Sequence, residues 1–183
     1  MVTAARLGAS RAYGTAGNTP FASTLGDPAQ IRKILDDNGA PMNDRSLIID
    51  TSAGAAMRTL AQLTKANEAG TSMTLRDGQL LDLHGFSVHE SAGVRTITKG
   101  TGTSYTSTTA GFAVGTTSIP LITGSGTVVA GDIVTFAGDT NKYVIATGIT
   151  APGTIVLAAP GLRVALAASA VAMTIGNNYT GNI

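Results

Sequence analysis

The chain contains no cysteine, which excludes disulfide bonds, thiolate metal sites and a cysteine nucleophile. Aromatic side chains are few, four Phe and four Tyr, and basic residues do not interleave with them, so no stacking platform for nucleic acid is indicated. Charged residues make up 13% of the sequence, and the formal net charge is +1. Such a balance produces no broad electrostatic field that would attract nucleic acid or an anionic membrane.

Long hydrophobic runs are missing as well. The longest candidate, Val164–Ile175, is short and rich in Ala, whereas a membrane-spanning helix needs about 18 or more apolar residues. The N-terminal residues MVTAARLGASRAYG lack the apolar core of a signal peptide. Hydrophobic residues still make up 43% of the 183 residues, which suits the core of one domain or of two small ones.

The few charges are unevenly distributed. Residues 1–99 hold ten Lys or Arg and nine Asp or Glu, whereas residues 100–183 hold only two of each, namely Lys142, Arg163, Asp132 and Asp139. We therefore predict a domain boundary near Lys99-Gly100. Residues 99–111 are low in complexity and predict a linker or a loosely held edge segment.

Short β-branched and aromatic runs dominate the stretch from Thr127 to Leu166. Turns rich in Gly, Pro, Asp and Asn separate them, which is the pattern of a meander of short strands. Their spacing of roughly 8 to 12 residues predicts an antiparallel β-barrel or sandwich over residues 112–176, followed by a tail over residues 177–183. The predicted core of this module comprises Val134, Phe136, Val144, Ile155 and Leu157.

The first part of the chain has helical signals. We expect residues 1–26 to be extended or poorly ordered, apart from a short helix over Thr3–Ala12. A second helix is predicted over Pro28–Asn38, because Asp27 is a typical N-cap and Pro28 suits the first helical position. Gly39 is expected to end this helix in the left-handed conformation.

A strand, a helix and a second strand are predicted next. Ser46–Asp50 has a continuous apolar run, which predicts a strand buried on both faces. Thr51-Ser52 is expected to cap a helix over Ala53–Thr64, and after a polar loop Phe86–His89 alternates like a half-buried strand. The predicted fold class is therefore α+β: a small helix and strand domain over residues 27–98 and an all-β, antiparallel, barrel-like insertion.

Several short motifs follow one another along the chain. In the first half they are Asp37-Asn38-Gly39-Ala40-Pro41, the strand Arg45–Asp50 before a small-residue helix, Asn67-Glu68-Ala69-Gly70, Leu75-Arg76-Asp77-Gly78 and His84-Gly85-Phe86-Ser87-Val88. In the second half they are Ala130–Asp139, Tyr143-Val144 and Ala159–Arg163. In this order the motifs resemble the phage P22-like coat protein family (gene protein 5), over about residues 20–180.

The resemblance implies a capsid subunit of the HK97-type fold, an α+β shell protein that often carries an inserted β-barrel. Such subunits also have an N-terminal arm, an extended hairpin loop and a long spine helix, which the sequence does not predict here, so we expect a partial subunit. The implied partners are other copies of the coat subunit and a scaffolding protein, without specific nucleic acid or membrane. The implied location is the virion, assembled in the host cytoplasm.

The same resemblance suggests where subunits meet. It places residues 25–98 around the capsomer axes, and the polar loop Thr64–Asp77 is the expected contact. The candidate contact residues are Lys65, Glu68, Arg76 and Asp77. Charges at the rim of an interface set register and association rate more than affinity.

Little in the sequence points to catalysis. His84 and His89 are the only histidines, and they would face opposite sides of a regular strand. Asp132 and Asp139 are explained by Gly turns, with a weak calcium site across the two loops as the open alternative. We expect no enzyme activity and no cofactor. The alternative function is a phage tail or carbohydrate-binding β-module.

Overall fold

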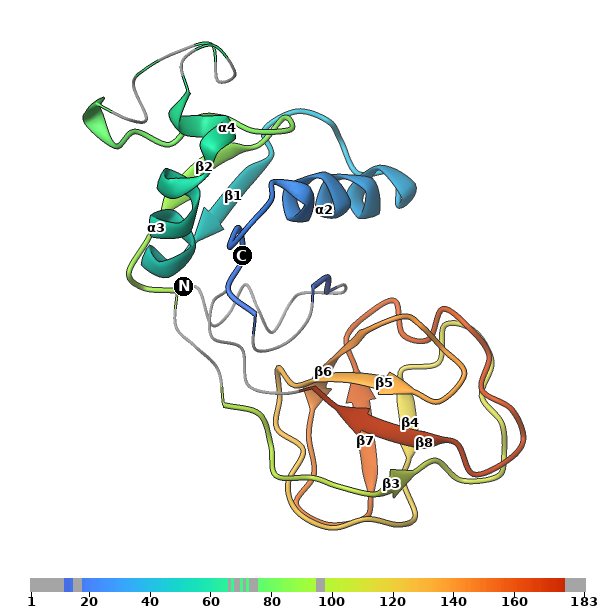
Figure 1. Cartoon of the computed structure of the whole chain (residues 1–183). Helices are drawn as coiled ribbons and strands as arrows, with labels where there is room; N and C mark the ends of the chain where they lie inside the picture. Colours follow the sequence, from blue (N-terminus) through green and yellow to red (C-terminus); the bar gives the residue numbers. More distant parts are fainter. Residues whose placement is uncertain are drawn as a thin grey trace. The chain divides into compact units, whose positions relative to one another are not determined.

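The computed structural model describes residues 12–14, 18–65, 67, 70, 72, 76–94 and 98–176. The chain divides into two compact units, an α+β unit that ends before Thr98 and a β unit over residues 98–176 (Figure 1). Their elements confirm the predicted α+β class with a barrel-like, antiparallel all-β part. The helix predicted over Thr3–Ala12 falls almost wholly outside the described residues, and the tail over 177–183 falls entirely outside them.

The α+β unit contains two parallel strands joined by a helical crossover. Helix α2 spans Gly26–Asp37 and strand β1 spans Ser46–Ile49. Helices α3, Thr51–Thr59, and α4, Ala61–Thr64, lead from β1 to strand β2, Ser87–Glu90. In the described part of this unit, β1 and β2 form a two-stranded parallel sheet.

Strand β1 is buried on one face only. Leu47 and Ile49 are buried and belong to one hydrophobic cluster with Ala53 and Met57 of α3, whereas Ile48 between them is 47% exposed. The predicted burial on both faces is therefore wrong. An apolar run cannot by itself reveal that the cluster lies on a single face of so small a sheet.

Helix α2 begins two residues earlier than predicted. Its N-cap position is Leu25, which makes no side-chain cap, so the predicted N-cap role of Asp27 is wrong. Asp27 lies in the first turn instead, where a carboxylate faces the positive end of the helix dipole. Gly39 has a φ of +70°, which confirms the predicted left-handed ending. Phe21, in the segment predicted to be extended, is 1% exposed and joins the core of this unit.

The helical crossover also differs from the prediction. Asp50 caps α3, because its Oδ1 accepts a hydrogen bond from Ala53 N at 2.8 Å. The cap therefore lies just before the predicted Thr51-Ser52 pair. The single helix predicted over Ala53–Thr64 is interrupted at Leu60, whose ψ of 128° is extended, and α4 follows it.

The β unit is a curled six-stranded antiparallel sheet. Its strands are β3 (Tyr105–Thr106), β4 (Ser118–Pro120), β5 (Ile133–Phe136), β6 (Tyr143–Thr147), β7 (Thr154–Leu157) and β8 (Ala172–Ile175). Their order across the sheet is β3-β8-β5-β6-β7-β4. Backbone bridges from Ser107 to Leu121 and from Thr103 to Ser125 join the segments that extend the two edge strands. These bridges give the sheet its barrel-like form (Figure 1).

Strand β3 lies inside residues 99–111, the segment predicted to be a linker or a loosely held edge segment. It pairs with β8 at the edge of the sheet. Tyr105 in this strand is 1% exposed, and its hydroxyl donates a hydrogen bond to Gly126 O at 2.6 Å. Of the two predicted alternatives, the structure shows the edge segment and not the linker, because one buried aromatic ring fixes a stretch whose Gly, Thr and Ser composition resembles that of a linker.

Four of the five predicted core residues, all except Val144, belong to the hydrophobic cluster of the β unit. Val144 is also buried, but it lies outside that cluster, between the cluster residues Tyr143 and Ile145 on β6. Val134, Phe136, Val144, Ile155 and Leu157 are each no more than 3% exposed. The ring of Phe136 packs against that of Tyr143, with centroids 5.9 Å apart and planes inclined at 55°. Alternation along β5 and β7 places the core residues on the inner face of the sheet.

Candidate contact surfaces

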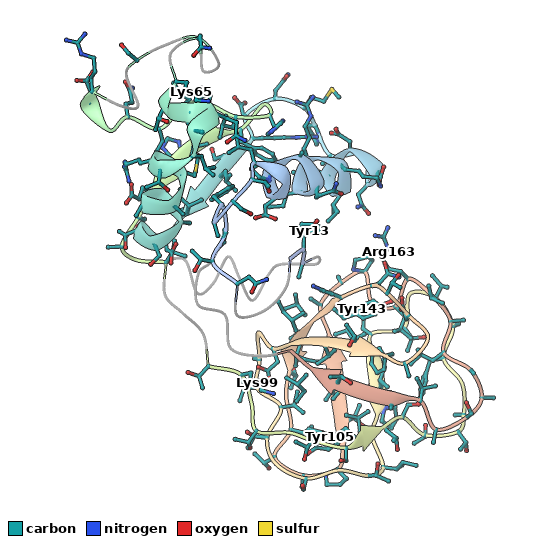
Figure 2. The ribbon with its side chains drawn as sticks, in the orientation of Figure 1. Tyr13, Lys65, Lys99, Tyr105, Tyr143 and Arg163 are labelled. Carbon is teal, nitrogen blue, oxygen red and sulfur yellow. The ribbon has the colours of Figure 1, made fainter. Side chains whose placement is uncertain are left out.

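The contact residues predicted from the sequence lie at the surface of the α+β unit. Lys65 follows α4, where Figure 2 labels it, and it is exposed. Arg76 and Asp77 are also exposed. Glu68 lies outside the described residues. The role of all four as inter-subunit contacts stays a prediction.

An ion pair that the sequence did not reveal links the helical crossover to strand β2. Arg58 Nη2 lies 2.5 Å from Glu90 Oε2, and Arg58 Nε donates a hydrogen bond to Gly78 O at 2.9 Å. Gly54 makes room for this pair, since a Cβ at that position would lie 2.7 Å from Glu90 Cδ. Arg58 therefore holds the end of the polar loop against α3 and β2. Thirty-two positions separate the two charges, so no local pattern could have paired them.

The two histidines occupy different local structures. His84 lies in a tight turn closed by the bridge from Leu83 to Phe86, with a φ of +51°, so its predicted place on a strand is wrong. His89 is an exposed residue of β2 opposite Ile48. Within the described residues, no group of three or more His, Asp or Glu side chains is arranged to hold a metal ion.

Asp132 is a buried carboxylate that organises two turns of the β unit. It is 2% exposed. Its oxygens accept hydrogen bonds from Gly100 N at 3.1 Å and from Val129 N at 2.8 Å. A buried carboxylate is stabilised by such donors. A Cβ at Gly100 would lie 2.2 Å from Thr127 O, so the close approach of these segments requires glycine there.

Asp139 forms a second buried carboxylate network. Its Oδ1 accepts from Asn141 N at 2.8 Å and from Asn141 Nδ2 at 2.6 Å. Its Oδ2 accepts a hydrogen bond from the Tyr143 hydroxyl, which in turn accepts one from Arg163 N at 3.1 Å. The network ties the turn before β6 to the segment that begins at Leu162, as Figure 2 shows for Tyr143 and Arg163.

Tyr143 should ionise later than tyrosine in a short peptide. Burial raises the pKa of its hydroxyl, and the hydrogen bond to Asp139 raises it further. Because the folded pKa lies above the unfolded value of about 10, Tyr143 contributes stability that is fully present below about pH 10. This contribution is lost as the pH rises through the folded pKa.

A spectrophotometric pH titration of the tyrosines measures this shift. We expect a late ionisation step in the wild-type chain that disappears in Tyr143→Phe, while the earlier steps are unchanged. A late step that persists in Tyr143→Phe would assign the shifted hydroxyl to another tyrosine and contradict the network described above.

No family model and no curated protein matches this chain. None of the helices in the described ranges is long and apolar enough to cross a membrane.

Proposed function

We propose that this chain is part of a structural capsid subunit of a phage or prophage and that it works by associating with further copies of the coat subunit. The observation that carries this proposal is architectural. A small α+β unit with a parallel crossover is followed by a six-stranded barrel-like sheet, the combination expected of an HK97-type shell subunit with an inserted β-barrel. In this proposal the protein belongs to the virion, assembles in the host cytoplasm with a scaffolding protein, and catalyses no reaction.

The buried polar groups of the described residues accept hydrogen bonds from within the fold, which supports this proposal. Asp50, Asp132 and Asp139 accept hydrogen bonds from backbone or neighbouring side-chain donors, and the buried Ser107 Oγ accepts from Val171 N at 3.1 Å. Each of these groups serves to hold segments of the fold together. A shell protein needs only such fixed geometry, since it acts through the shape and chemistry of its surface.

The alternative of a carbohydrate-binding module receives less support. Sugar rings commonly stack on exposed aromatic side chains in binding sites. In residues 98–176, Tyr105, Phe136 and Tyr143 are buried, and Phe112 is half-buried against the core. The aromatic rings of the β unit therefore serve packing.

Two measurements on the purified chain separate these functions. In sedimentation velocity, the average mass should rise above 18.3 kDa with increasing concentration and fall again on dilution, as expected for weak self-association. A glycan array should show no binding. A strictly monomeric chain at every concentration together with saturable glycan binding would overturn the capsid proposal in favour of the alternative.

A further inference from the structure

The sequence contains a single Asn-Gly pair, Asn38-Gly39, and it lies at the C-terminal end of α2. Both residues are exposed. Because glycine has no side chain, its backbone nitrogen can approach the side-chain carbonyl of a preceding asparagine closely. In that approach the nitrogen attacks Cγ of the asparagine and closes a five-membered succinimide ring. Asn38 therefore has the neighbour that favours deamidation, and the surrounding structure sets how fast the reaction proceeds.

The reaction balances with water as the only added reactant. The Gly39 nitrogen loses its proton as it attacks Cγ of Asn38. The new N–Cγ bond replaces the Cγ–Nδ2 bond, and the amide group leaves with that proton as ammonia. Water then opens the succinimide at one of its two N–C bonds, which gives aspartate or isoaspartate. Either product carries a negative charge at neutral pH that the asparagine lacked.

The folded chain holds both of the atoms that must move. Gly39 N, the attacking atom, donates a hydrogen bond to Asp36 O at 3.0 Å. Asn38 Nδ2, the leaving atom, donates one to Ile34 O at 2.5 Å. The ψ of Asn38 is 7°, so the Gly39 nitrogen eclipses the backbone nitrogen of Asn38 and not its Cβ, as ring closure requires. Deamidation therefore needs the last turn of α2 to open.

A buried arginine restrains this turn. The Arg45 side chain is 7% exposed. Its Nη1 lies 2.7 Å from Asp36 Oδ1, and this hydrogen bond holds the pKa of Asp36 below its usual value. Its Nη2 donates a hydrogen bond to Ala40 O at 2.8 Å, and Ala40 N donates to Leu35 O at 3.0 Å. Arg45 thus binds the chain on both sides of the Asn-Gly pair.

We propose that Asn38 is a deamidation site whose rate is set by the opening of the last turn of α2, which Arg45 restrains. The modification then keeps the turn open. It adds a negative charge at the C-terminal end of a helix, where a carboxylate opposes the helix dipole, and beside Asp36 and Asp37. Isoaspartate also inserts an extra methylene into the main chain, which moves Gly39 N away from its acceptor. This inference does not depend on the proposed function.

Peptide mapping by mass spectrometry measures the modification in the full chain. The chain is incubated at mildly alkaline pH in oxygen-isotope-labelled water, which marks the new carboxylate, once folded and once unfolded in guanidinium chloride. We expect Asn38 to acquire the label several-fold faster in the unfolded chain, because unfolding frees both reacting atoms. Asn43 is the matched control, since it is also exposed but is followed by Asp44. It should acquire far less label in either state.

Two variants test the restraint by Arg45, each compared with its own unfolded chain. Asp36→Ala should raise the folded-state rate several-fold toward the unfolded rate, because Arg45 loses its carboxylate partner. Asp37→Ala should leave that rate nearly unchanged. It is the matched control, because it removes an i,i+4 ion pair with Lys33, just as Asp36→Ala removes one with Arg32, but it removes no contact with Arg45.

Three results would overturn the proposal. Absence of label at Asn38 in the unfolded chain would show that the pair is not a deamidation site. Equal rates in the folded and unfolded chains would show that the last turn of α2 does not control the reaction. Equal effects of Asp36→Ala and Asp37→Ala would remove Arg45 from the restraint. None of these results changes the sedimentation experiment, so the proposed function is tested separately.

Discussion

Replacing Phe136 with Ala should lower the free energy of unfolding of the β unit by about 3–5 kcal/mol, the usual cost of removing a fully buried Phe side chain. Phe136 is 2% exposed, and its ring packs on Tyr143, which is equally buried. Strand β5 is paired on both sides, with β6 and with β8, which leaves its backbone little freedom to collapse into the resulting cavity. For a unit of this size, about 1 kcal/mol shifts the melting temperature by about 4–8 °C.

Near-UV circular dichroism during urea unfolding measures this loss, because Tyr105 and Tyr143 both lie in the core of the β unit. The matched control is Ile122→Ala, which removes a side chain that is 50% exposed. It should change the midpoint little. A Phe136→Ala variant with the midpoint of the wild-type chain would show that the inner face of β5 is not the core.

Replacing Asp132 with Ala should lower the free energy of unfolding by about 2–4 kcal/mol, because hydrogen bonds to a charged group contribute about 1.5–3 kcal/mol each. The change leaves the N–H groups of Gly100 and Val129 without their acceptor. Gly100 is buried, so water cannot easily replace the carboxylate at that end. Asp132 thus links the first residues of the β unit, at Gly100, to the turn before β5, at Val129.

Urea unfolding of Asp132→Ala and Asp132→Asn distinguishes the carboxylate from the space it fills. Asn retains one carbonyl oxygen as an acceptor, so it should lose less stability than Ala. Addition of calcium should leave the midpoint of the wild-type chain unchanged, because both carboxylates already accept hydrogen bonds from the protein. An increase in stability with calcium would instead favour the ion site that the sequence left open.

Much of the β unit could be predicted from its sequence because its signals are local. The alternation around Val134 and Phe136 identifies an inner face, and Gly and Pro clusters mark the turns. The sequence left residues 99–111 open between a linker and an edge segment, because Tyr105 is one aromatic residue among Thr, Ser and Gly. Its burial depends on Gly126, a partner 21 positions away. The strand propensities of a few neighbouring residues carry no information about a partner so far along the chain.

The candidate surfaces were harder to predict for the same physical reason. Arg45 reads as a surface cation in the sequence, yet it is buried because the carbonyl groups of the preceding turn and Asp36 converge on it. The sequence does not reveal that the segments containing Val114 and Val164 are neighbours, because they are brought together by antiparallel pairing of distant residues. The loop from Thr64 to Asp77 was predicted as the inter-subunit contact from the family resemblance together with its length and charge, and it remains a prediction.

The most direct test of the capsid proposal is the protein composition of purified virus particles. Mass spectrometry of the dominant shell protein should recover peptides from both residues 18–94 and residues 98–176, at the abundance expected of the main structural component. Recovery of these peptides only from tail fractions or from host protein, and not from the shell, would contradict the proposal.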